Sequence, residues 1–304
     1  SGNEPQRPSV TYMPGSGRAI FQGGESDVTA VVDYVHISTL GNAVDWGDLS
    51  QARQSSAGIG TLTRGFVAGG ALASGYTDDV DATIFATRGN YARFGDLTNG
   101  RSNHGGLNNA IRGVFGGGYT PDPAGRTNII DYITLATGGS GADFGDLTAV
   151  ADMANNAAAS STRGIWMGKG APSAKTIDYI TIASTGNATD FGDMLADSGT
   201  KSGCSNSIRA VGAVGHTSNV IEYLTIASTG DATDFGDLTV SRGKGAAAAS
   251  PTRAIFAGGA EPGDSNIIDY ITIASTGDAA DFGDRLNALT NVSGATESHG
   301  GLSG

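Results

Sequence analysis

The sequence repeats one unit six times along almost its whole length, and this repetition limits the folds open to it. Each unit begins with an arginine, a short apolar run and glycines, as in Arg64-Gly-Phe-Val-Ala-Gly-Gly70. The spacings between successive arginines are 46, 48, 51, 46 and 44 residues, and the six are Arg18, Arg64, Arg112, Arg163, Arg209 and Arg253. A period of this length is typical of repeat architectures such as propellers and solenoids. The chain is therefore expected to form one repeat array and not two unrelated domains.

Each unit holds three further segments: two follow the arginine run, and one, made of small residues, precedes the arginine. A block rich in β-branched and aromatic residues, such as Ile177-Asp-Tyr-Ile-Thr-Ile182, favours a strand. A Gly-Asn turn then leads to a block such as Phe191-Gly-Asp193, and this turn chemistry indicates a hairpin. A segment of small residues, such as Ala246 to Ser250, precedes the next arginine. Each unit is thus predicted to form four short strands.

Six such units predict an all-β fold, a six-bladed β-propeller with four antiparallel strands in each blade. The small-residue segment is expected to be innermost, because strands converge near the axis. The Phe-Gly-Asp segment is expected to be outermost, with its aspartates on an open edge where charge discourages pairing between edges. We assign residues 17–304 to the propeller, with units starting near the six arginines, and residues 1–16 to an N-terminal extension.

The ring is predicted to close through the C-terminal end of the chain. Ser298-His-Gly-Gly-Leu302 resembles Asn103-His-Gly-Gly-Leu107, which precedes the strand at Arg112, so this segment is the candidate inner strand of the first blade. The alternative is Val10 to Pro14, but Tyr12 and Met13 are bulky and Pro14 lacks a backbone donor.

Composition argues against several functional classes. With 18 basic and 30 acidic residues the net charge is −12, which disfavours a nucleic-acid partner because phosphates must be neutralised. Cys204 is the single cysteine and the four histidines lack ligand spacing, so no disulfide, zinc site or cofactor is expected. Quartets such as Asp234 to Asp237 leave calcium as an alternative to a turn and edge role, and we predict no metal. No apolar run approaches a membrane span and no signal peptide is visible, so no membrane insertion is expected.

Two strings carry a resemblance to a known group of proteins. Ile177 to Asp193 and Arg253 to Gly259 resemble repeats of structural and tail proteins of marine bacteriophages, particularly those of cyanobacteria, and the match spans residues 17 to 304. The resemblance implies a virion component of a tail, baseplate or fibre, assembled in the host cytoplasm. It implies no particular ligand. The unit is also similar to kelch repeats and to the Asp-box of sialidase propellers, but Ala188 stands where that box has serine or threonine.

Function is expected to reside where the units differ. A residue that recurs in every blade occupies six equivalent places, so we expect it to serve folding. No nucleophile elbow or Ser/His/Asp arrangement is visible in the sequence, and no catalytic residue is predicted. The loops joining the second strand to the third and the fourth to the next blade emerge on one face and vary most in length. Loops on a rigid scaffold commonly carry recognition. The candidate binding residues in them are Tyr76, Tyr119, Asp122, Arg126, Lys175, His216, Glu261 and Asp264.

The sequence therefore favours a non-catalytic virion protein that presents a variable loop face. Its expected partners are other virion proteins or a glycan or protein of the host surface. The alternatives left open are a lectin or sialidase-like glycan enzyme, solvated loops without function, and an assembly module that forms homo-oligomers through the opposite, constant face.

Overall fold

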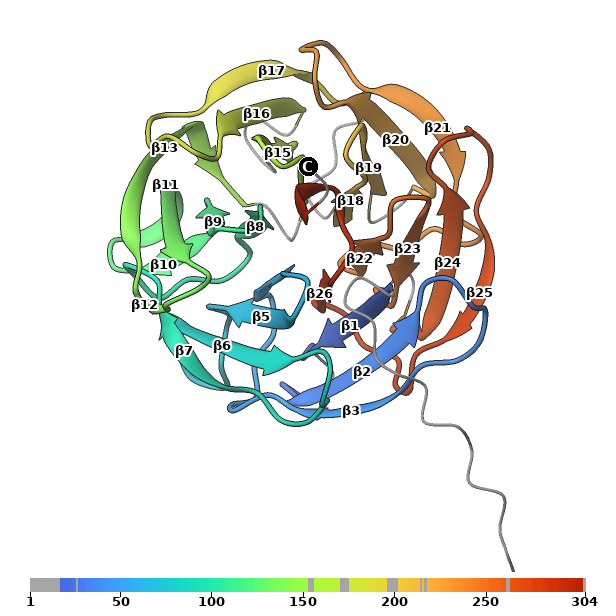
Figure 1. Cartoon of the computed structure of the whole chain (residues 1–304), viewed down its shortest axis with the longest axis horizontal. Coiled ribbons are helices and arrows are strands. Elements are labelled where there is room, and N and C mark those ends of the chain that lie inside the picture. Colours follow the sequence, from blue (N-terminus) through green and yellow to red (C-terminus); the bar gives the residue numbers. More distant parts are fainter. Residues whose placement is uncertain are drawn as a thin grey trace, which may run out of the picture.

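The protein is a closed ring of six β-sheets around a central axis (Figure 1). The structure, a computed structural model, describes residues 17–25, 27–152, 156–169, 175–195, 202–213, 215, 218–260 and 263–302. The extension 1–16 and the alternative inner strand Val10 to Pro14 lie outside this part of the chain. The predicted six-bladed propeller with four antiparallel strands per blade is confirmed.

The order of the strands within each blade is the predicted one. The innermost strands are β26 (Ser293–Thr296), β4 (Ala57–Gly60), β8 (Gly105–Asn108), β14 (Ala157–Ala159), β18 (Ser202–Ser205) and β22 (Ala246–Ala249). The second strands are β1 (Arg18–Gln22), β5 (Arg64–Ala68), β9 (Arg112–Gly116), β15 (Arg163–Met167), β19 (Arg209–Ala213) and β23 (Arg253–Ala257). The third strands are β2 (Val31–His36), β6 (Asp79–Ile84), β11 (Ala124–Thr134), β16 (Thr176–Thr181), β20 (Val220–Thr225) and β24 (Ile267–Thr272). The outermost are β3 (Val44–Asp48), β7 (Ala92–Asp96), β13 (Ala142–Ala151), β17 (Thr189–Asp193), β21 (Thr233–Asp237) and β25 (Ala280–Asp284).

We number the blades 1 to 6 by their second strands, from β1 to β23. The variable face carries the connections from second to third strands and from one blade to the next. The constant face carries the turns within the first and last hairpins of each blade. Blade 3 adds the short strand β10 (Tyr119–Pro121), and β12 (Gly139–Ser140) lies parallel to the edge of blade 2.

The C-terminal part of the chain closes the ring, but with a different segment from the predicted one. The inner strand of blade 1 is β26, which pairs with β1 from Ser293↔Gln22 to Thr296↔Ala19. The predicted segment Ser298 to Leu302 follows it and contains a 3-10 turn, η1 (Gly300–Leu302). The sequence likeness to residues 103–107 was therefore misleading, because β26 had already filled the inner position.

Apolar side chains of neighbouring blades pack face to face and form the core. Between blades 5 and 6, for example, Val211 and Phe256 share a cluster with Phe235 and Ile273. Trp166 is fully buried, and its indole N–H donates to the Gly105 carbonyl of blade 3 at 3.0 Å. Stability is therefore distributed around the ring, since each blade completes its core only with its neighbours.

The outer edges are not open, contrary to the sequence prediction. The turn of each following blade crosses the outermost strand and hydrogen-bonds to it. At blade 4, Gly230 N donates to Phe191 O and Ala232 N to Asp193 O, both at 2.8 Å. Gly192, at φ +148°, permits the approach, because a Cβ there would lie 2.4 Å from the Gly230 carbonyl oxygen. The Phe-Gly-Asp strand of one blade is thus the edge that is covered, and the glycine turn of the next blade covers it. The two segments recur together because each junction between blades needs both.

The repeated arginines connect the same neighbours on the constant face. Arg163 donates to the Ile226 carbonyl of blade 5 at 2.7 Å, and its guanidinium lies over its own blade's Tyr179 at 4.6 Å. Equivalent bonds to the next blade are made by Arg18, Arg112, Arg209 and Arg253. The acceptors at these five positions are therefore backbone carbonyl groups of the next blade.

Candidate functional site

Among the described residues, the variable face departs from sixfold regularity most at blade 3. There β10 and the first residues of β11 form a hairpin, with Tyr119 paired to Arg126 and Pro121 to Ala124. The outer strands continue toward the same face, where Thr127 pairs with Ala151. The connection between the second and third strands of blade 3 is thus an ordered projection and not an irregular loop.

Two of the predicted binding residues meet at the base of this hairpin. The rings of Tyr76, from blade 2, and Tyr119 pack edge to face, with centroids 6.1 Å apart and planes at 64°. Isolated bridges between Ala71 and Tyr76 and between Ser102 and Tyr119 hold the two backbones. Tyr119 remains 38% exposed, so this pair offers a rigid aromatic surface to solvent. We call it the tyrosine pair.

Charged and polar groups of the hairpin lie beside the tyrosine pair. Asn99 of blade 2 donates to the Asp122 carbonyl at 3.2 Å and fixes the hairpin tip. Arg126 pairs loosely with Asp152, with 3.9 Å between Nε and Oδ2. Burial raises the pKa of the Asp152 carboxyl, and the charges of Arg126 and Lys244 oppose that rise. The junction of blades 2 and 3 therefore combines an aromatic surface, a partly exposed cation and a carboxyl group.

The remaining predicted binding residues are not part of this junction. Lys175 lies on blade 4, where its ammonium group donates to the Leu195 carbonyl at 2.8 Å. Asp264 lies on blade 6, exposed, in a bridge with Ala260. His216 and Glu261 fall outside the described residues. The structure thus unites four of the eight candidates: Tyr76, Tyr119, Asp122 and Arg126.

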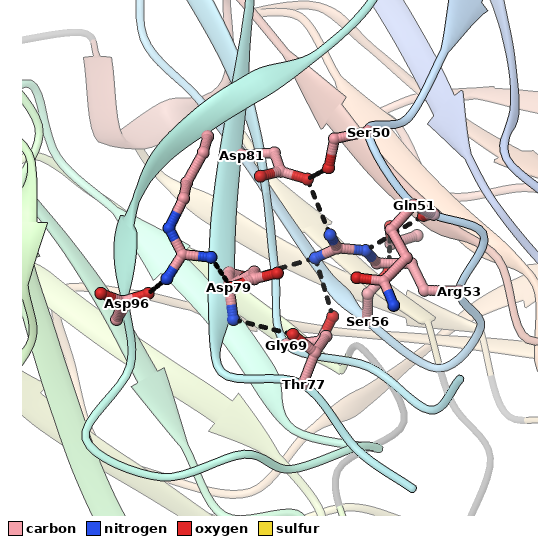
Figure 2. A network of polar contacts seen from close by, with 11 residues as sticks. Ser50, Gln51, Arg53, Ser56, Gly69, Thr77, Asp79, Asp81 and Asp96 are labelled. Atoms are coloured by element: carbon pink, nitrogen blue, oxygen red, sulfur yellow. Dashed lines mark hydrogen bonds and ion pairs between the residues drawn. The ribbon is translucent and has the colours of Figure 1, made fainter. Parts of the chain in front are cut away.

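Buried ion pairs near the variable face were missed by the sequence analysis. Arg53 and Asp81 form such a pair at 2.7 Å, with Ser50 donating to the same carboxylate and further bonds from Arg53 to the Gly69 and Asp79 carbonyls (Figure 2). Equivalent pairs at 2.8 to 3.0 Å are Arg101–Asp131, Lys169–Asp178, Arg242–Asp269 and Arg285–Asp33. Their side chains are at most 3% exposed, so they offer nothing to a ligand. The four arginine pairs join neighbouring blades, whereas Lys169–Asp178 lies within blade 4.

A sequence signal for these pairs did exist. It is the motif Asp-Leu-Thr/Ser-x-x-Arg, present as residues 48–53, 96–101 and 237–242. Its arginine lies in the connection that leads into the next blade, whose third strand supplies the acid. Burial lowers the pKa of Arg53 and of Arg101, and the partner carboxylates oppose this shift. An unpaired charge at such positions would be strongly destabilising.

Within the described part of the chain, one group of three carboxylates lies close enough to hold a cation: Asp78, Asp79 and Asp96. Arg93, however, forms ion pairs with Asp79 and Asp96. In this blade the arginine occupies the position of the first acid of the Asp-x-Gly-Asp quartet. Its guanidinium already supplies positive charge to the group.

The central channel is narrow and is covered at the constant face. Its cavity of about 60 Å³ is lined by the six innermost strands, and this volume holds only a few water molecules. The 3-10 turn lies across the end of the cavity, where a Cβ on Gly301 would lie 1.9 Å from the Asn108 carbonyl oxygen. The His299 imidazole forms a hydrogen bond with the Gly60 carbonyl at 2.7 Å.

Cys204 is buried, and burial raises the pKa of its thiol.

The fold defines a class: a six-bladed β-propeller, here with an added hairpin on the variable face of blade 3. No protein-family model matches the sequence, and no curated protein matches it either. Among the described residues, no helix is long and apolar enough to cross a membrane. Propellers serve many functions, so the functional argument rests on the site itself.

Proposed function

We propose that this protein is a non-catalytic binding propeller of a phage virion, and that the junction of blades 2 and 3 binds a host-surface glycan or protein. The observation that carries the binding role is the tyrosine pair, because it joins two different blades beside the projecting hairpin of blade 3. Tyrosine supplies large contact area with little loss of side-chain entropy, and is common in binding surfaces.

The neighbouring groups support a polar ligand. Arg126 is exposed and only loosely paired with Asp152. A carboxylate or sulfate group of a ligand can therefore compete for its guanidinium, and hydroxyl groups can bond to Asp152. The location in a virion rests on the resemblance of the repeats to those of marine phage structural proteins, and not on the fold.

The test is binding to a glycan array and to intact host cells, compared between the wild type and Tyr119→Ala. Loss of one central aromatic anchor should weaken binding about tenfold to a hundredfold. The matched control is Ile208→Ser, which changes a side chain that is 63% exposed on the constant face, and it should bind like the wild type. Equal binding by Tyr119→Ala and the wild type would reject this site.

The same preparations distinguish the enzyme alternative. Glycans that bind are incubated with the protein and analysed for released products. Turnover that disappears in Asp152→Asn would contradict the non-catalytic role, since this is the carboxyl group with the raised pKa at the junction. Labelling the protein in its native particle then locates it within the virion, and its absence from the particle would reject the virion assignment.

A further inference from the structure

One arginine of the repeated set lacks the partners that its five counterparts have. Within the described residues, the guanidinium of Arg64 makes no hydrogen bond, whereas Arg163 donates to Ile226 O at 2.7 Å and Arg209 to Ile273 O at 2.9 Å. The position equivalent to Ile226 in the blade next to Arg64 is Leu135. The N–H donors of the Arg64 guanidinium are therefore available to a ligand, although Arg64 occupies the same position in its blade as the other five arginines.

The cause lies in its own blade. In blades 3 to 6 a tyrosine of the third strand lies beneath the arginine, as Tyr179 does for Arg163 at 4.6 Å, and blade 1 has Tyr34 at the equivalent position. In blade 2 this residue is Ala82. The Arg64 guanidinium lies instead 5.7 Å from the centre of the Phe94 ring. Without the tyrosine beneath it, Arg64 is not directed toward the carbonyl of the next blade.

Arg64 lines a hollow between blades 2 and 3 on the constant face. The hollow has a volume of about 420 Å³, against about 350 Å³ for its counterpart between blades 4 and 5. Leu62 and Ala110 line it where the counterpart has Ser161 and Ser207, and Leu135 lies at its wall. Both hollows keep two other hydroxyl side chains, which are Thr61 and Thr63 at Arg64, so the hollow at Arg64 is the more apolar of the two by these two exchanges.

From these differences we infer that the hollow at Arg64 binds a carboxylate attached to a short apolar group. The guanidinium can hold a carboxylate through two parallel N–H···O bonds, a geometry that lysine lacks. The aliphatic part would pack on Leu62 and Ala110. Two sources share this chemistry: a free aliphatic carboxylate, and the C-terminal carboxylate of a peptide that ends in an apolar residue.

The test uses hexanoate, with hexanamide as a neutral control of matched shape, measured by calorimetry or by ligand-observed NMR. We expect saturable binding of hexanoate with a dissociation constant below about 10 mM, and binding of hexanamide at least tenfold weaker. The second arm compares a short peptide ending in leucine, with a free carboxylate, to its C-terminal amide. Tighter binding of the free-acid peptide than of hexanoate assigns the site to peptide termini; the reverse assigns it to small carboxylates.

Two variants make the inference specific to Arg64. Arg64→Gln removes the cation and should weaken hexanoate binding at least tenfold, with little change in melting temperature because the guanidinium makes no hydrogen bond to any described residue. Ala82→Tyr restores the residue found in the other five blades. It should direct Arg64 to the Leu135 carbonyl and abolish binding while the protein stays as stable as the wild type or becomes more so.

Leu62→Ser introduces the residue type that the counterpart hollow has at this position, which is Ser161. It should weaken the binding of hexanoate more than the binding of acetate. Absence of saturable binding by both hexanoate and the peptide, or equal binding by Arg64→Gln and the wild type, would overturn the inference. Tyr119→Ala should leave hexanoate binding unchanged, so the failure of this site and the failure of the variable-face site are separate results.

Discussion

Arg285 of blade 6 forms an ion pair with Asp33 of blade 1 at 3.0 Å, and neither side chain has any exposed surface. The guanidinium bonds to both carboxylate oxygens, and the backbone N–H of Leu286 donates to the same carboxylate at 3.1 Å. The pair therefore joins the last blade to the first, beside the closure made by β26.

We expect Arg285→Ala to lower the free energy of unfolding by about 3–5 kcal/mol, because Asp33 would remain buried without its cation. The measurement is urea-induced unfolding followed by fluorescence. The control is Arg93→Ala, since Arg93 is 58% exposed although it pairs with two aspartates. An exposed pair is screened by solvent, so this change should cost less than about 1 kcal/mol. Equal effects of the two changes would contradict the assignment of the buried pair to ring closure.

Gly192→Ala should disrupt the cover on the edge of blade 4. The new methyl group would lie 2.4 Å from the Gly230 carbonyl oxygen, and the residue already has φ +148°. Gly186→Ala is the matched control, because φ there is +153° and a Cβ meets nothing within 4 Å. Both changes carry the backbone strain, so the difference between them isolates the contact. We expect Gly192→Ala to be less stable than Gly186→Ala by about 2 kcal/mol in thermal unfolding.

Truncation should separate the two roles of the C-terminal part of the chain. Ending the chain before Ser293 removes β26, so blade 1 loses its inner strand and the ring opens. We expect this protein to lose cooperative unfolding. Ending the chain after Ser298 removes only the cover of the central channel, and a folded ring with a lower melting temperature should remain. A cooperative, compact product from the longer deletion, seen by calorimetry and size-exclusion chromatography, would contradict closure by β26.

His299 should make stability depend on pH. Burial lowers the pKa of its imidazole to about 4, and the bond to the Gly60 carbonyl opposes this shift. The neutral ring satisfies both contacts, since Nε2–H donates to Gly60 O while Nδ1 accepts from Gly301 N–H at 3.1 Å. Its contribution is therefore complete above about pH 6.5 and is lost as the pH falls toward 4.

The expected slope from this one residue is at most about 1.4 kcal/mol per pH unit within that range. His104 adds to it, because burial and the charge of Arg101 also lower its pKa. Unfolding free energies measured from pH 4 to pH 7 should show a shallower slope for His299→Gln than for the wild type. An unchanged slope would show that His299 does not titrate in this range.

The sequence predicted the architecture well because the fold is periodic. The repeated strand segments, their order from axis to rim and the number of blades follow from residues that recur at fixed positions. The same periodicity led to the wrong closing segment at the C-terminus. The likeness of residues 298–302 to residues 103–107 outweighed the weaker strand signal of Ser293–Thr296, which forms the closing strand. The hydrogen bonds that cover the outer edges could not be predicted from the repeat, because each joins a turn and an outer strand of different blades, which are far apart in sequence.

The candidate site was predicted only in part. Tyr76 and Tyr119 were identified because they stand in variable loops, but their edge-to-face contact depends on how neighbouring blades are placed in space. The exchange of a tyrosine for Ala82 is visible in the sequence. Its consequence for Arg64 is not, since it requires knowing that each arginine reaches the carbonyl of the next blade.

The sequence by itself therefore determined the class of fold, the number of blades and the identity of the residues that every blade needs, because local strand and turn preferences repeat at a constant period. The tertiary structure alone decided which residues of different blades meet: the partner of each buried charge, the segment that closes the ring, and the arginine that has no acceptor among the described residues. The physical reason is that these contacts form between separate sheets packed around an axis, and their geometry depends on the whole ring and not on any one segment.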